Sequence, residues 1–140
     1  MCDASYPWLI LVPARDGLRH LHDLDDDELA LAAAEVARAP EALEAIYQPQ
    51  RINVAAFGNV VEQLHIHVIV RFKTDQAWPN PVWGMAPARV YHPNILEDTV
   101  DLLRQIKANQ SKSVKVLTVY HGTAKANWCK IMEDNLKVPD

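Results

Sequence analysis

The sequence predicts one α+β domain in which an antiparallel sheet packs against helices. Three observations predict this fold class. An apolar run over residues 6–12 is typical of a buried strand. An alanine-rich stretch over residues 29–39 favours a helix. Two β-rich segments, 51–57 and 60–72, are separated only by Gly58 and Asn59, as in a tightly joined antiparallel pair.

The connection between the first strand and the helix is polar and reads as a loop. Asp25 is expected to cap the helix, because Glu28 follows three residues later and acidic side chains suit the positive end of a helix. Pro40 is expected to bend this helix, or to start a second segment over residues 40–47, because proline lacks the amide hydrogen that a helix interior needs.

The second half of the chain predicts less regular structure. Residues 74–93 are rich in proline and tryptophan and read as a loop, and a helix is expected to start at Pro93. A further strand is predicted over 114–120 and a short helix over 124–135. We therefore divide the chain into a domain at residues 1–108 and a linker with a strand–helix extension at 109–140.

Composition excludes several function classes. The chain has 140 residues, 49% of them hydrophobic, and a formal charge of −4, so it lacks the basic footprint that a long nucleic acid would need. Cys2 and Cys129 are far apart in the sequence and form no metal-type pair. We find neither an apolar run of about 20 residues nor a signal peptide, and expect a soluble, cytoplasmic protein with no membrane partner.

The segment from Gln63 to Val70 carries the strongest functional signal. Successive side chains of a strand alternate between its faces, so Gln63, His65 and His67 are expected to form a polar row while Ile66 and Val68 face the core. Three polar side chains on a mostly buried strand are costly unless they have partners. The row therefore indicates a site.

The residues alone leave three interpretations open. Imidazole is a competent nucleophile at phosphorus, and neutral amides can stabilise charge that develops there; Asn53 and Asn59 on the adjoining strand and turn are candidates beside Gln63. Two histidines at this spacing also suit zinc, with a third ligand from one of four others, namely His20, His22, His92 or His121. The third interpretation is structural.

Residues 51–69 resemble the histidine triad (HIT) family, whose signature is His-x-His-x-His followed by two apolar residues. Asn53 and Gly58 are also at the family's places, and the run Trp-Pro-Asn-Pro-Val-Trp-Gly at 78–84 resembles a bacterial branch of HIT proteins. The resemblance covers roughly residues 1–108. It implies a HIT-like antiparallel sheet with packed helices, and a homodimer.

The resemblance also implies a chemistry. Members hydrolyse or transfer nucleotides from nucleoside–phosphate–X substrates, such as phosphoramidates and diadenosine polyphosphates, through a nucleotidyl-histidine intermediate. His65 matches the attacking histidine, and His67 matches the last one, which contacts phosphate or supports the nucleophile. Asn53 matches a substrate-binding asparagine, and His22 an upstream histidine, with His20 as its competitor. A small nucleotide is the implied partner; no cofactor is required, and a divalent cation stays open.

Three departures from the family pattern matter, and the first two favour an alternative. The first triad position is Gln63 instead of histidine, and Val60 stands where many HIT hydrolases have a residue that assists the leaving group. The segment that matches the first strand also lies close to Met1, which is earlier than in most members. The alternative is a nucleotide-binding protein with weak or no catalysis, and a metal-binding protein is the second alternative.

Two further segments have open roles. Trp78 and Trp83 are expected either to cover the site or to pack the loop. Residues 119–123, Val-Tyr-His-Gly-Thr, weakly resemble the opening of ADP-ribosyltransferase-like domains. The alternative for this C-terminal piece is a strand and helix packed on the HIT-like domain.

Overall fold

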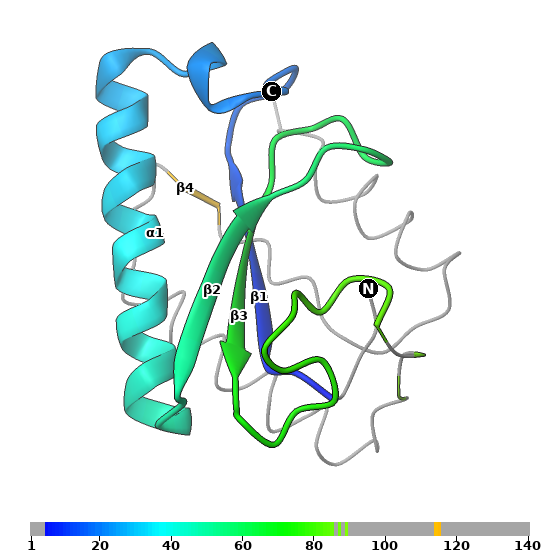
Figure 1. The fold of residues 1–140 in the computed structure, drawn as a ribbon. Helices are drawn as coiled ribbons and strands as arrows, with labels where there is room; N and C mark the ends of the chain where they lie inside the picture. The colour runs from blue at the N-terminus through cyan, green and yellow to red at the C-terminus, as the bar shows by residue number, and fades with distance from the viewer. Residues whose placement is uncertain (1–4, 86, 88, 90–113, 116–140) are drawn as a thin grey trace.

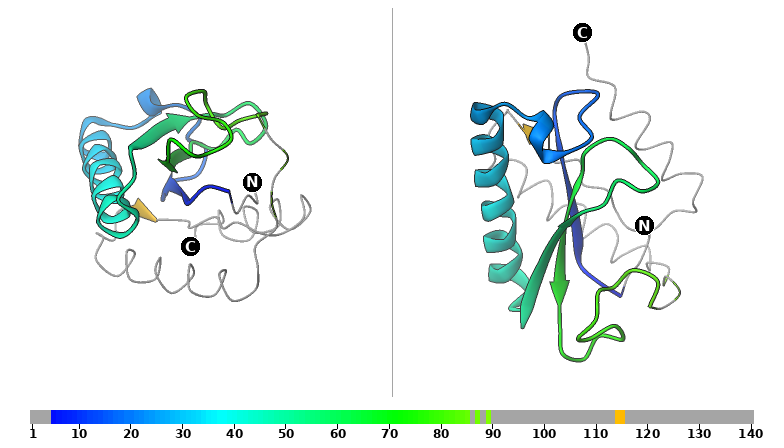
Figure 2. Two further views of the ribbon diagram at one scale, coloured as in Figure 1. Left: turned by 60° about the horizontal axis from the view of Figure 1, so that its bottom comes forward. Right: turned by 45° about the horizontal axis from the view of Figure 1, so that its top comes forward.

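The fold is an antiparallel sheet with one long helix against it, as the computed structural model shows for residues 5–85, 87, 89 and 114–115. The sheet order is β2-β3-β1-β4, and all neighbours pair antiparallel. Helix α1 lies along one face of the sheet (Figures 1 and 2). The predicted α+β class is confirmed. The bounds of the elements are β1 Trp8–Pro13, η1 Leu21–Asp23, α1 Asp26–Tyr47, β2 Arg51–Ala56, β3 Ile66–Arg71 and β4 Val114–Lys115.

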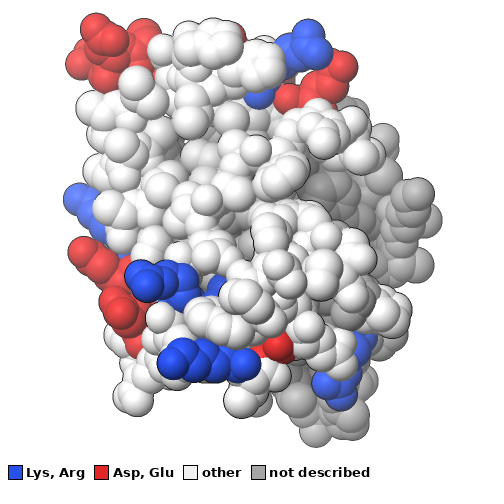
Figure 3. All heavy atoms as spheres, in the orientation of Figure 1, with Lys and Arg blue, Asp and Glu red and all other residues white. Residues whose placement is uncertain are grey.

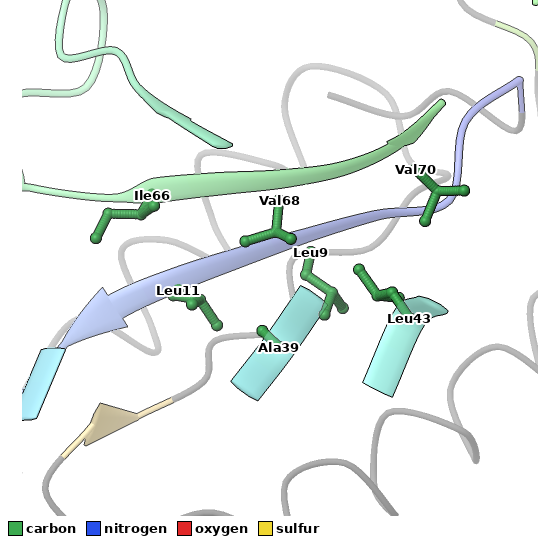
Figure 4. Packing of buried hydrophobic residues seen from close by; sticks show 7 residues of the cluster. All are labelled: Leu9, Leu11, Ala39, Leu43, Ile66, Val68 and Val70. Carbon is green, nitrogen blue, oxygen red and sulfur yellow. The ribbon is translucent and has the colours of Figure 1, made fainter. Parts of the chain in front are cut away.

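Strand β1 is buried along its whole length, as the apolar run predicts. Its alternate side chains belong to two different clusters, because the sheet is covered on both faces. Leu9 and Leu11 pack with Ala39 and Leu43 of α1 and with the apolar side chains of β3 (Figure 4). Trp8, Ile10 and Val12 pack on the opposite face. The sheet therefore has an aliphatic face toward α1 and a second face that carries aromatic side chains.

Helix α1 begins as the sequence predicts. The Asp25 carboxylate accepts a hydrogen bond from the Glu28 amide at 2.8 Å, and the Glu28 carboxylate accepts one from the Asp25 amide at 3.1 Å. This capping box satisfies two backbone donors that the first turn leaves without helical partners.

Of the two alternatives for Pro40, the start of a second segment is wrong, because α1 runs without a break from residue 26 to 47 with Pro40 inside it. Proline in a helix interior costs about 3 kcal/mol. Ala39 and Leu43 lie on either side of it and are buried against the sheet. A buried leucine alone contributes about 1.5–3 kcal/mol, so tertiary packing offsets the local cost.

Strands β2 and β3 pair as expected, with Asn53 opposite Ile69 and Ala55 opposite His67. The predicted extent of the second strand is wrong, however, because β3 begins at Ile66 and not at residue 60. Residues 57–65 form a loop instead of a tight turn. The Leu64 amide donates to the Leu18 carbonyl at 2.7 Å, so this segment pairs with the connection that follows β1 rather than with β2.

Residues 72–85 form a series of turns, which confirms the predicted loop where the structure describes it. The predicted helix from Pro93 and the helix over 124–135 lie outside the described residues. Of the strand predicted over 114–120, the structure describes Val114 and Lys115, which pair with the end of β1.

On the face seen in Figure 3, charged side chains lie at the top, along the left side and in the lower part, and the area between them is uncharged. Within the described part of the chain, no helix is long and apolar enough to cross a membrane.

Candidate functional site

The two histidines of the predicted row lie on the second face of the sheet, His67 within β3 and His65 directly before it. Ile66, Val68 and Val70 point toward α1, so the intervening side chains point to the opposite face. His65 and His67 are both buried, and their ring centroids lie 4.9 Å apart, edge to face. The predicted alternation is therefore confirmed for these residues.

The His65 ring is oriented by the main chain. Its Nδ1 lies 2.7 Å from the Gln63 carbonyl oxygen. A carbonyl oxygen only accepts hydrogen bonds, so Nδ1 carries the proton and donates it. In the neutral ring the lone pair is then on Nε2, and the described residues form no hydrogen bond to that atom. Nε2 is therefore the ring nitrogen of His65 without a partner among the described residues.

The His67 ring is enclosed by aromatic side chains. Trp8 and Trp83 contact it edge-on, with centroid distances of 5.3 and 5.5 Å, and Phe57 lies at 6.4 Å. Trp8 Nε1 also donates a hydrogen bond to Nδ1 of His67 at 3.0 Å. Burial, and after it the charge of His65, lower the pKa of His67 to about 4, so His67 is neutral at pH 7.

A cleft of about 370 Å³ lies beside His65. The loop after β2 contributes Gly58 and Asn59 to its wall, and the segment around η1 contributes Arg19 and His20. At its rim, Arg19 forms an exposed ion pair with Glu62, with an N–O distance of 3.3 Å. The cleft therefore combines an imidazole, an amide and a charge-balanced rim, a set of groups that suits a small polar ligand.

Gln63 does not extend the row of histidines. It lies in a bend before β3, and its side-chain amide bridges the loop after β1: Nε2 donates to the Arg15 carbonyl at 3.1 Å, and Oε1 accepts from the Gly17 amide at 3.2 Å. The expected row of three side chains on one strand is therefore wrong for Gln63, and of the two histidines only His67 lies within β3. The part of Gln63 that contacts a histidine is its main-chain carbonyl.

The other predicted site residues are divided between two places. Asn59 lines the cleft. Asn53 lies on β2, where its Oδ1 accepts a hydrogen bond from Arg71 at 2.7 Å. His22 is 81% exposed and stacks on His20 at 5.0 Å, but only His20 lines the cleft. Of the two competing upstream histidines, the structure brings His20 to the site.

The two loop tryptophans also differ in position. Trp83 contacts both His67 and Phe57, the latter with a centroid distance of 4.4 Å. Trp78 lies beside the Arg71 guanidinium at 5.9 Å. Trp83 is therefore part of the histidine site, whereas Trp78 packs at the other end of β3.

Metal-binding side chains do not cluster in the described part of the chain, which contains no group of three or more His, Cys, Asp or Glu side chains placed to hold an ion. His92 and His121, two of the candidate third ligands, lie outside the described residues.

The sequence reasoning missed Trp8 and Phe57. Trp8 belongs to an apolar run that reads simply as core, and Phe57 closes the strand before the glycine turn. The antiparallel register that places Ile10 opposite His67 and Trp8 opposite Ile69 would have found Trp8, since alternate side chains of neighbouring strands share a face.

Comparisons with known proteins agree with this geometry. The HIT domain family model matches residues 1–74. A histidine triad protein from Bradyrhizobium japonicum is 39% identical with a TM-score of 0.71, over 75% of this chain and 78% of that one. One from Marinobacter aquaeolei is 34% identical with a TM-score of 0.74, over 79% and 81%.

A third such structure, from Sinorhizobium meliloti, is 33% identical with a TM-score of 0.69, over 74% of this chain and 78% of that one. The comparison with curated proteins gave no match. The family model matches more than half of the chain, and the three solved relatives are 33–39% identical to it over the aligned parts. The chain therefore belongs to the histidine triad (HIT) family.

Proposed function

We propose that the protein is a nucleotide hydrolase or nucleotidyl transferase that acts on nucleoside–phosphate–X substrates, with His65 as the nucleophile. The observation that carries the proposal is the orientation of this ring. Nδ1 of His65 donates a hydrogen bond to the Gln63 carbonyl at 2.7 Å. His65 also lines the cleft. Family membership supports the substrate class.

The reaction has two steps in this proposal. The lone pair on Nε2 of His65 attacks the α-phosphorus, the bond from phosphorus to X breaks, and X leaves with the bonding electrons and takes up a proton. Water then attacks the same phosphorus, the phosphorus–nitrogen bond breaks, and the nucleoside monophosphate leaves. Because Nδ1–H donates to a fixed carbonyl, the ring does not need to reorient between the steps.

The departure at the first triad position does not remove this orientation. The main-chain carbonyl at position 63 is present whichever side chain this residue carries. The side-chain amide of Gln63 instead forms hydrogen bonds to the loop after β1. In this proposal Asn59, an amide in the cleft wall, donates a hydrogen bond to a phosphate oxygen. Neutral donors aimed at developing charge are a strong source of transition-state stabilisation.

Val60 favours the alternative of a nucleotide-binding protein with weak catalysis. Its side chain is 91% exposed and offers no hydrogen-bonding group next to Asn59 in the loop. A leaving group that needs help from this position would depart slowly. Under this alternative, mononucleotides bind while turnover stays low.

The test is chemical trapping with a radiolabelled nucleoside phosphoramidate, in wild type, in His65→Ala and in His22→Ala. We expect an acid-labile, base-stable label on wild type and on His22→Ala, because His22 is exposed outside the cleft, and no label on His65→Ala. Full turnover by His65→Ala would contradict the proposed nucleophile. Binding of AMP or GMP with neither label nor product would favour the alternative.

Two family properties stay proposals. We propose a homodimer, which sedimentation velocity tests directly, and a cytoplasmic location. Equal nucleotide binding with and without a chelator would count against the metal-binding alternative.

A further inference from the structure

A buried hydrogen bond joins β1 to the second histidine of the site. Trp8 Nε1 and His67 Nδ1 lie 3.0 Å apart, although the two residues are 59 positions apart in the sequence. The side chains of Trp8 and His67 are only 4% and 5% exposed. A hydrogen bond in such an enclosed place is well defined, because water does not compete for either partner.

The direction of this bond fixes where the imidazole proton lies. Indole N–H is a donor and has no acceptor lone pair, so Nδ1 of His67 must accept and cannot carry a proton. A neutral imidazole carries one N–H, and here it can only be at Nε2. The described residues form no hydrogen bond to this Nε2, so among them its N–H has no acceptor.

The surroundings of His67 keep the ring neutral as well. Among the described residues, the titratable side chain against it is His65, at a centroid distance of 4.9 Å. The other rings in contact with it, from Trp8, Trp83 and Phe57, carry no charge. Burial and the neighbouring His65 both lower the pKa of His67, which removes the doubly protonated form from the pH range in which most enzymes work.

We propose that Trp8 is a positioning residue: its indole N–H holds His67 in the Nε2–H tautomer, so that His67 presents a hydrogen-bond donor to an oxyanion held beside His65. This inference rests on the proposed function. A phosphoryl oxygen is an acceptor, and a fixed donor aimed at it is favourable without reorganisation. With this tautomer His67 does not act as the general base for the attacking water, because neither of its nitrogens has a free lone pair.

The structure supplies a matched control in Trp83. Its ring contacts the same imidazole at nearly the same distance as Trp8, 5.5 against 5.3 Å, and at a similar angle, 77° against 69°. The hydrogen bond to Nδ1 comes from Trp8. A variant of Trp83 therefore changes the aromatic packing of His67 without removing the donor.

The experiment reads the tautomer directly. Nitrogen-15 NMR of the histidine rings distinguishes a protonated ring nitrogen from an unprotonated one, and it needs no substrate. It is applied to the full chain as wild type, as Trp8→Phe and as Trp83→Phe. A fourth sample carries benzothienylalanine at position 8, an analogue that keeps the shape of tryptophan and replaces the N–H by sulfur, in case Trp8→Phe fails to fold.

We expect Nε2 of His67 to be protonated in wild type and in Trp83→Phe, and the proton to be shared between both nitrogens when the Trp8 N–H is absent. With a phosphoramidate substrate, we expect kcat to fall about tenfold in the Trp8 variants, equivalent to one hydrogen bond to a charged oxygen, with KM changed less than twofold.

Protonation at Nδ1 in the wild type, or an unchanged tautomer and kcat in the benzothienylalanine protein, would overturn the proposal. The two readouts separate this inference from the proposed function. A tautomer that depends on Trp8 in a protein without turnover would support the role of Trp8 and contradict the proposed activity.

Discussion

The same face of β3 carries polar side chains at both ends, and the two ends differ in how those side chains are satisfied. At one end, Arg71 is 2% exposed and its guanidinium donates four hydrogen bonds: to both carboxylate oxygens of Asp75 at 2.8 and 3.0 Å, to Asn53 at 2.7 Å and to the Asn80 carbonyl at 2.9 Å. At the other end, His65 is bound through one nitrogen, at Nδ1.

This difference separates polar residues that maintain the structure from those that keep a group for a ligand. A buried charge is tolerated when it is paired and hydrogen-bonded, and the hydrogen bonds of Arg71 are made within the protein. The Arg71 cluster instead ties the loop over residues 72–85 to the sheet, and this loop carries Trp83 to His67. The histidine end keeps an unpaired nitrogen beside a cleft, as a reactive group requires.

The largest effect expected from this comparison is on stability. Arg71→Met removes one partner of a buried pair and leaves the Asp75 carboxylate uncompensated, so we expect the free energy of unfolding to fall by about 3–5 kcal/mol. Urea denaturation measures it. Arg71→Met combined with Asp75→Leu should recover part of the loss. A single variant within 1 kcal/mol of wild type would contradict the assignment of this cluster to structure.

The histidine end predicts a pH dependence. The pKa of His67 is lowered to about 4 from 6.5, so the unfolded chain binds more protons between these values, and stability is present above pH 6.5 and lost as pH falls toward 4. The loss attributable to this ring is about 3 kcal/mol. Unfolding free energies at pH 7.0 and 4.5 measure it.

The matched variant for this pH dependence is His67→Gln, whose side-chain oxygen can still accept from Trp8. We expect a smaller loss of stability between pH 7.0 and 4.5 in His67→Gln than in wild type. Asp75, whose pKa is also perturbed, does not interfere. Burial alone would raise its pKa, but the hydrogen bonds and charge of Arg71 hold it below 3.8. Equal losses in both proteins would show that His67 is not the group that titrates.

A smaller effect separates the side chain of Gln63 from its carbonyl. Gln63→Ala removes two hydrogen bonds to the loop after β1, so we expect a destabilisation of about 1–2 kcal/mol. The carbonyl that orients His65 remains, and kcat should therefore fall much less than in His65→Ala. Parallel urea denaturation and phosphoramidate turnover measure both. A loss of turnover as complete as that of His65→Ala would assign the amide itself to the chemistry.

The smallest effect is expected at the rim of the cleft. The Arg19–Glu62 ion pair is exposed, with side-chain exposures of 60% and 72%, and pairs of this kind contribute less than about 1 kcal/mol. Glu62→Gln should leave the melting temperature nearly unchanged while it frees the Arg19 charge. Substrate KM measured at two salt concentrations would detect that charge if the rim contacts an anionic ligand.

The sequence predicted most of the fold because its signals are local. The capping box of Asp25 and Glu28, the buried run of β1 and the alternation of β3 each depend on neighbours in the chain. The two errors have tertiary causes. Pro40 stays within α1 because the helix packs against the sheet. Residues 60–65 are not part of β3, and within them the Leu64 amide donates to the Leu18 carbonyl.

The site was predicted only in part. The two histidines were identified because they interrupt an apolar segment, and Asn59 because it lies in the predicted turn near them. Trp8 was not predicted as a site residue. Its contact with His67, which is 59 positions away in the sequence, depends on the register between β1 and β3. The side-chain amide of Gln63 forms hydrogen bonds to Arg15 and Gly17 in the loop after β1. Strand alternation does not predict these contacts, because Gln63 lies in a loop.

The packing of Trp8 and Trp83 against His67 has a practical consequence. Both indoles contact a single imidazole edge-on, and a protonated imidazole quenches the fluorescence of a tryptophan that it touches, whereas a neutral one does so much less. The emission of the protein should therefore dim as His67 gains its proton and change when a ligand reaches the ring. The site thus contains its own optical reporter, so occupancy and ionisation can be followed without any added label.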